Sequence, residues 1–214
     1  MTPAPYLSRR AALSISLLCW AGFAVVAALV IAGRGAGFDH AGTVLWRSAD
    51  TLSPRMTVMV RDISAMGGAV VRNVIAISVV ITLLFLRMKR EAALLVFTAL
   101  SGTAVAAGLK LLFDRPRPDI LPHLVEVSDT SFPSGHSFNS AVTYLAIAFA
   151  LCALARSKAA SRTLIAGAMA ISLTVAWSRV WLGVHYPTDV IAGWLGGVGW
   201  ALLLAGLAQA SVRR

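Results

Sequence analysis

Long apolar runs separated by short polar segments make up most of this chain. Each run is close to the roughly 20 residues that an α-helix needs to cross a bilayer. Six runs can be distinguished, at residues 11–32, 66–86, 92–113, 137–154, 164–181 and 190–208. The pattern predicts an all-α protein, an integral membrane bundle of six transmembrane helices. It shows no internal repeat and no separate soluble region, so we predict one polytopic membrane domain over residues 1–214.

The first run begins like a secretory signal peptide, because Arg9 and Arg10 precede it. It is nevertheless long enough to span a bilayer, and no clear cleavage site precedes Arg34. We therefore expect the run to be retained as the first transmembrane helix.

The segment 33–65 mixes apolar and charged positions. Its members are Leu45, Trp46, Leu52, Met56, Val58, Met59 and Ile63, interleaved with Arg47, Arg55, Arg61 and Asp62. Short helices lying at the membrane interface, where they could flank a lipid entrance, are one interpretation. A folded loop that caps the bundle is the other.

Composition agrees with a membrane protein, since 58% of the residues are hydrophobic, 13% are charged and the mean hydropathy is +0.78. A net charge of +10 would suggest a nucleic-acid partner in a soluble chain. Here most charges fall in short connections between apolar runs, where they indicate topology instead. We therefore predict the lipid bilayer, and no nucleic acid, as a partner; protein partners are unknown from the sequence.

Small residues inside the runs are interpreted as packing positions. Cys19 and Cys152 both lie in apolar surroundings, so we expect neither a disulfide nor a metal role for them. Glycines recur in the last run at spacings that let helices approach closely, at Gly193, Gly196, Gly197 and Gly199.

The Lys and Arg positions predict an orientation with both termini in the cytoplasm. Ten of the 19 basic residues would then lie close to cytoplasmic helix ends: Arg9, Arg10, Arg87, Lys89, Arg90, Arg156, Lys158, Arg162, Arg213 and Arg214. Segments 114–136 and 178–187 would both lie on the extracytoplasmic (periplasmic) side of a plasma or inner membrane.

Three polar stretches meet at that predicted face: KLLFDRPRP from Lys110, PSGH from Pro133 and SRVWLGVHYPTD from Ser178. One Lys at a helix end is more often an anchor that reaches for the interface. Taken together, three cations, two histidines, a carboxylate and a helix N-terminus are what phosphoryl transfer requires.

The combination K-x6-RP, PSGH and SR-x5-H-x3-D resembles the type 2 phosphatidic acid phosphatase family. All three motifs are complete and in order over residues 110–189, whereas the first two runs match the family only in general character. The resemblance implies a membrane enzyme that hydrolyses a phosphate ester or diphosphate on a lipid.

The resemblance and the chemistry of the side chains imply the same roles. His185 would attack phosphorus and form a phosphohistidine, because a neutral imidazole exposes a lone pair without a base. Asp189, four residues later, would accept the Nδ1 proton and leave Nε2 facing the phosphate. His136 would protonate the leaving oxygen and then activate water.

Charge stabilisation would come from the phosphate-binding residues Lys110, Arg117, Ser134, Gly135 and Arg179. Phosphoryl transfer depends mainly on positioning and charge neutralisation, so these groups suffice without a cofactor or metal. The spacing selects Arg117 over Arg115, which we interpret as a supporting residue or a lipid-phosphate contact. We expect Asp114 and Asp119 to pair with these arginines.

Families with these motifs process phosphatidate, phosphatidylglycerol phosphate, undecaprenyl diphosphate and lipid A phosphates. An outer-leaflet site favours an isoprenoid diphosphate, with phosphatidate next. Two alternatives belong to other classes. Vanadium haloperoxidases share the motifs but resemble soluble proteins, and a non-catalytic lipid carrier would need neither both histidines nor Asp189.

Overall fold

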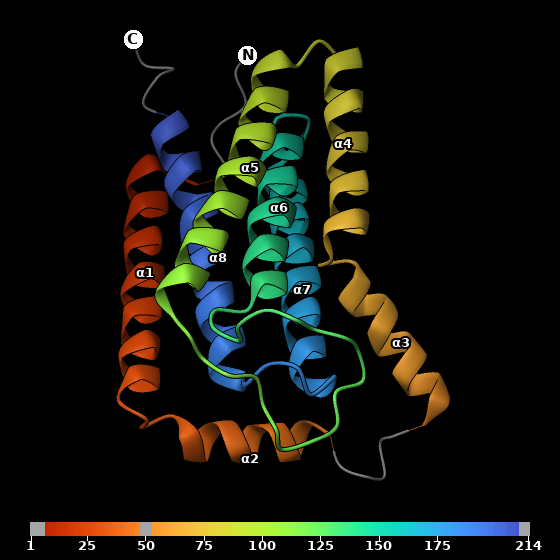
Figure 1. Cartoon of the computed structure of the whole chain (residues 1–214). Coiled ribbons are helices and arrows are strands. Elements are labelled where there is room, and N and C mark those ends of the chain that lie inside the picture. The colour runs from red at the N-terminus through yellow and green to blue at the C-terminus, as the bar shows by residue number, and fades with distance from the viewer. Residues whose placement is uncertain (1–6, 48–52, 210–214) are drawn as a thin grey trace.

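The structure, a computed structural model, describes residues 7–47 and 53–209 and is built from helices (Figure 1). Their bounds are α1 Arg9–Ile31, α2 Ala36–Trp46, α3 Pro54–Ala65, α4 Ala69–Phe85, α5 Lys89–Leu112, α6 Gly135–Cys152, α7 Lys158–Trp181 and α8 Pro187–Ala208. No strand occurs in these two stretches, so the predicted all-α class is confirmed. The sequence predictions that involve Leu52, Arg213 and Arg214 lie outside the described residues.

Several helices begin at residues that suit a helix start. The hydroxyls of Ser8, Ser53 and Ser157 each accept a hydrogen bond from a backbone N–H in the first turn, at α1, α3 and α7. Pro187 occupies the first position of α8, where its missing N–H costs no hydrogen bond. Local sequence thus sets where these four helices begin.

The six predicted apolar runs coincide with α1, α4, α5, α6, α7 and α8. Four of these, α1, α5, α7 and α8, are long and apolar enough to cross a membrane on their own. Helices α3 and α4 meet this test only together, as a pair bent by 51°. Helix α6 is outside this set because its first two turns carry the polar residues His136, Ser137, Asn139 and Ser140, which lower its mean hydropathy. The chain is therefore a multi-pass membrane protein.

Helix α6 lies at the centre of the bundle, packed against α5, α7 and α8, while α1 packs against α8. Figure 1 shows α2 lying across one end of the bundle, beside the long loop between α5 and α6 and the α7–α8 turn. The start of α1 and the end of α8 lie at the opposite end. Segment 33–65 contains the helices α2 and α3, as the first of its two interpretations predicted, while their position at the membrane interface stays a prediction. All three motifs reach the end that α2 covers.

The glycines of α8 allow its backbone to touch α6. A Cβ atom at Gly193 would lie 2.5 Å from the carbonyl oxygen of Ser134, and one at Gly197 would lie 2.3 Å from that of Phe138. A Cβ atom at Gly199 would lie 3.0 Å from the Trp20 ring of α1. The predicted packing role of these glycines is confirmed, and it fixes the start of α6 against the start of α8.

We expect Gly197→Ala to lower the free energy of unfolding by about 1–3 kcal/mol, because the added methyl group would force α6 and α8 apart. Gly108→Ala is the matched control, since a Cβ atom there meets nothing within 4 Å and alanine favours a helix. Thermal unfolding of the two variants in detergent measures the difference. Equal midpoints would contradict this account of the contact.

Candidate active site

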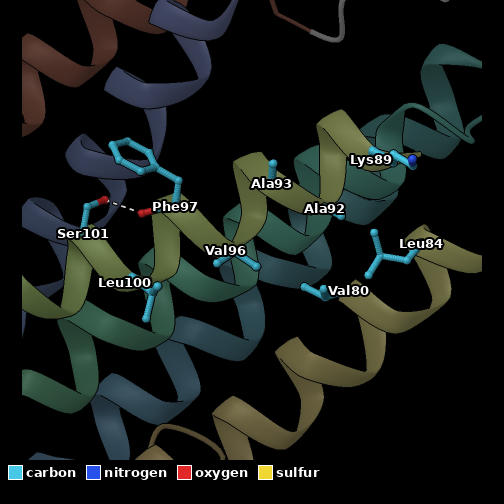
Figure 2. Close-up of a pocket in the computed structure, with 9 residues that line it drawn as sticks. All are labelled: Val80, Leu84, Lys89, Ala92, Ala93, Val96, Phe97, Leu100 and Ser101. Atoms are coloured by element: carbon cyan, nitrogen blue, oxygen red, sulfur yellow. Dashed lines mark hydrogen bonds between the residues drawn. The ribbon is translucent and has the colours of Figure 1, made fainter. Parts of the chain in front are cut away.

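Two cavities differ sharply in chemistry. One, of about 690 Å³, is a groove between α4 and α5 that is lined almost entirely by apolar side chains, with Lys89 at one end (Figure 2). The other, of about 460 Å³, lies at the end of the bundle covered by α2. Its polar lining includes Arg61, Ser64, Lys110, Arg117, Glu126, Asp129, Gly135, His136, Arg179 and His185. Only the second has the groups that polar chemistry requires, and we call it the polar cavity.

The start of α6 contributes Gly135 and His136 to the polar cavity. Among the described residues, no side chain hydrogen-bonds to the His136 ring. Ser134 lies behind this face and is fully buried. Its N–H donates to the backbone carbonyl of Asp189 at 3.0 Å, and its hydroxyl accepts from Ser137 at 3.1 Å. The N–H of Ser134 is thus used within the bundle, and a phosphate contact of its hydroxyl stays a prediction.

His185 and Asp189 meet at the start of α8. The Nδ1 atom of His185 lies 3.5 Å from Oδ2 of Asp189, which is long for a hydrogen bond. The hydroxyl of Ser131 lies beside both, 2.5 Å from Oδ2 of Asp189 and 3.4 Å from Nδ1 of His185. The Tyr186 N–H also donates to Oδ2, at 2.9 Å. The carboxylate thus faces Nδ1, and Nε2 is left on the cavity side.

Burial is the main influence on the charge of His185. The residue is 1% exposed, and burial lowers the pKa of its imidazole to about 4 despite the opposing effect of Asp189. Nη1 of Arg117 lies 3.2 Å from Nε2, and this nearby positive charge lowers the pKa further. The ring is therefore neutral at physiological pH, as a nitrogen nucleophile requires.

Lys110, Arg117 and Arg179 bring three cations to the polar cavity. Lys110 and Arg117 both donate to the carboxylate of Asp129. Arg179 is 4% exposed, and its Nη1 donates to Ser64 at 2.7 Å. Its buried Nε has no hydrogen-bond partner, and no carboxylate of the described chain lies within ion-pair distance of it. A buried guanidinium in this condition marks a place for an anion.

Arg115 has partners that differ from the predicted ones. It donates to Asp189 at 2.5 Å and to Asp39 of α2 at 2.7 Å. Arg117 pairs with Asp129, so the expected pairing of both arginines with Asp114 and Asp119 is wrong. Arg115 points toward the bundle and pairs with two buried carboxylates, whereas Arg117 pairs with a carboxylate of its own loop. None of these partners is the nearest carboxylate in sequence.

Asp39 also ties α2 to α8. Its carboxylate accepts from the N–H of Thr188 at 2.9 Å and from the Thr188 hydroxyl at 2.8 Å. The side chains of Asp39 and Asp189 are almost fully buried, so both carboxylates depend on Arg115 for charge compensation. Arg115 therefore supports Asp189 from behind, away from the cavity.

Sequence reasoning missed several residues that touch the candidate site: Asp39, Ser64, Asp129 and Ser131. Asp39 is an acidic residue in a largely apolar segment, which is a signal that could have identified it. Ser131 sits three residues before Ser134 and has no comparable signal. Groups of three or more metal-binding side chains are absent from the described residues.

Comparison with known proteins links this site to a family. The family model of the PAP2 superfamily matches residues 91–213. Phosphatidylglycerophosphatase B of Bacillus subtilis (strain 168) is 45% identical over 89 residues, which are 40% of this chain and 42% of that protein. The putative undecaprenyl-diphosphatase YbjG of Escherichia coli (strain K12) is 36% identical over 87 residues, 40% of this chain and 39% of that protein. The chain thus spans about two fifths of the length of these curated relatives.

A solved structure is similar over nearly the whole fold. The crystal structure of the first transmembrane PAP2 type phosphatidylglycerolphosphate phosphatase from Bacillus subtilis superposes with a TM-score of 0.84. The match covers 91% of this chain and 96% of that one, with 26% sequence identity. Since the match covers 91% of the chain, it extends well beyond residues 110–189, where the motifs lie.

We expect the His185 ring to stay neutral from pH 8 down to about pH 5, because burial lowers its pKa to about 4. The ordinary pKa of histidine is 6.5, so at a pH between 6.5 and about 4 this ring is protonated in the unfolded chain but not in the folded one. The free energy of unfolding therefore decreases as the pH falls through this range. Histidine NMR titration in detergent, with His185→Gln to assign the signal, measures the pKa. A value at or above 6.5 would show that the charge of Asp189 outweighs burial.

Proposed function

Because the chain belongs to the PAP2 superfamily, we propose that it is a membrane phosphatase that hydrolyses a terminal phosphate from a lipid phosphate or diphosphate. The observation that carries the proposal is the buried guanidinium of Arg179, which lacks a carboxylate partner among the described residues. It lines one cavity with two histidines and three more cations, Arg61, Lys110 and Arg117. A phosphate would supply the missing negative charge.

The proposed reaction has two steps. Nε2 of His185 attacks phosphorus, the bond from phosphorus to the lipid oxygen breaks, and His136 donates a proton to that oxygen. His136 then takes a proton from water, the water oxygen attacks phosphorus, and the N–P bond breaks to release inorganic phosphate. Lys110, Arg117 and Arg179 neutralise the charge on the phosphoryl oxygens.

Asp189 is the positioning residue for the nucleophile. Its carboxylate lies on the Nδ1 side of His185 and is held by Ser131, Tyr186 N–H and Arg115. With a proton kept on Nδ1, the lone pair is on Nε2, which faces the cations of the cavity. Arg115 contacts Asp189 and not the cavity, so we assign it a supporting role.

We assign six membrane spans to α1, α4, α5, α6, α7 and α8, with both termini in the cytoplasm and the polar cavity on the extracytoplasmic side. The lysines and arginines of the α4–α5 and α6–α7 connections, which lie at the end opposite the cavity, support this orientation. A site on the outer leaflet suits an isoprenoid diphosphate. The relatives named above as a phosphatidylglycerophosphatase and an undecaprenyl-diphosphatase support a lipid carrying a terminal phosphate.

We expect the purified protein to release phosphate in detergent and EDTA from phosphatidylglycerol phosphate, phosphatidate or undecaprenyl diphosphate. His185→Ala should abolish release from every substrate, because no phosphohistidine can form. His136→Ala should fail on a lipid monophosphate, whose alkoxide leaves poorly, yet accept phosphate from an activated aryl phosphate and accumulate the phosphoenzyme.

Acid-labile, base-stable label trapped in His136→Ala and absent from His185→Ala is the result that fits these roles. Label in His185→Ala alone would reverse them. Activity lost completely in EDTA would contradict a metal-free mechanism.

A labelling experiment tests the orientation. With Cys19 and Cys152 replaced by alanine, we expect a cysteine at Ser128 to react with an impermeant thiol reagent in intact spheroplasts. A cysteine at Lys158, at the other end of the bundle, should react only after lysis. The reverse pattern would place the cavity in the cytoplasm.

A further inference from the structure

We propose that the carboxylate of Asp129 competes with the substrate phosphate for Lys110 and Arg117, and so sets how tightly the site holds phosphate. This inference rests on the proposed function, because it takes those two cations to be phosphate ligands. No sequence motif includes Asp129. Its place in the site comes from its contacts alone.

The carboxylate of Asp129 uses one oxygen for each cation. Nζ of Lys110 donates to Oδ2 at 2.5 Å, and Nη2 of Arg117 donates to Oδ1. A phosphate bound here would use the same arrangement, with one oxygen bound by the lysine and another by the arginine. Asp129 therefore occupies the donors that the substrate needs.

Two other nitrogens of Arg117 donate to backbone carbonyl oxygens, and Nη1 also lies 3.2 Å from Nε2 of His185. Nε donates to the carbonyl oxygen of Asp129 at 2.8 Å, and Nη1 donates to that of Val184 at 2.6 Å. These two bonds hold the guanidinium plane in place. The Nη2 contact is different, because its partner is a side chain that can rotate away while the guanidinium stays fixed.

Exposure shows which partner can move. The side chain of Asp129 is 58% exposed, against 18% for Lys110 and 11% for Arg117. Rotation of the carboxylate into water costs little, whereas the cations remain partly buried. Burial alone would raise the pKa of Asp129, but hydrogen bonds and charge from Lys110 and Arg117 lower it to about 2, so the group stays charged at neutral pH.

The charges of the groups favour both the replacement of the Asp129 carboxylate by the substrate phosphate and its return after hydrolysis. A phosphate monoester carries about −1.5 to −2 charges at pH 7, so it can replace a carboxylate of charge −1 on the same cations. After hydrolysis, the carboxylate competes with inorganic phosphate and favours its release. The alternative role for Asp129 is to hold Lys110 and Arg117 in position for the substrate. In that case, loss of Asp129 would weaken phosphate binding.

The test measures binding of inorganic phosphate by calorimetry on the purified protein in detergent, so that it does not depend on turnover. We expect Asp129→Asn to bind phosphate about fivefold to tenfold more tightly than the wild type, the scale of two partly exposed ion pairs. Asp129→Ala should also bind more tightly, because phosphate replaces the lost contacts.

Glu126→Gln is the matched control. Glu126 lines the same cavity and forms none of the salt bridges found in the described chain, so its replacement removes one negative charge without freeing Lys110 or Arg117. We expect it to change phosphate affinity less than about twofold.

Phosphate affinity that is unchanged or weaker in the Asp129 variants would overturn the inference. An equal gain in phosphate affinity in Glu126→Gln would also overturn it, as would the absence of phosphate binding in every protein tested. If the Asp129 variants bind more tightly but the wild type hydrolyses no lipid phosphate, the proposed function fails and the competition stands. If hydrolysis is normal without tighter binding, the competition alone fails.

Discussion

One buried carboxylate, that of Asp189, determines how the candidate site is assembled. It accepts hydrogen bonds from Arg115, Ser131 and the Tyr186 N–H, and it faces His185. These partners come from the long α5–α6 loop and the α7–α8 turn, and Arg115 extends the network to α2 through Asp39. A fully buried charge is stable only with such partners, so the segments that supply them must meet at the start of α8.

The close contact between α6 and α8 fixes the other half of the site. Because glycines let the two helix backbones touch, Ser134 can donate its N–H to the carbonyl oxygen of Asp189. That hydrogen bond fixes the start of α6, from which Gly135 and His136 line the same polar cavity as His185. Packing deep in the bundle thus sets the separation of the two histidines, which loop residues alone could not hold.

The sequence was sufficient for the helices and the motifs but not for the ion pairs. Apolar runs of near-spanning length located α1, α4, α5, α6, α7 and α8, and the three motifs located the cations and histidines that line one cavity. The partners of Arg115 and Arg117 were not predictable, because Asp39 and Asp129 meet them only through the path of the chain in space. Asp114 and Asp119, the nearest carboxylates in sequence, are not their partners.

Under the proposed function, Arg179 explains why the phosphate headgroup, and not the lipid tail, would dominate recognition. Its guanidinium is buried with one hydroxyl partner at Nη1 and an unpaired Nε, which raises the free energy of the folded chain. An anion that reaches it recovers that free energy, whereas an apolar tail gains little by moving from lipid to an apolar helix face. The proposed phosphatase would therefore gain most of its binding energy at the phosphate, where that energy can act on the reacting bonds.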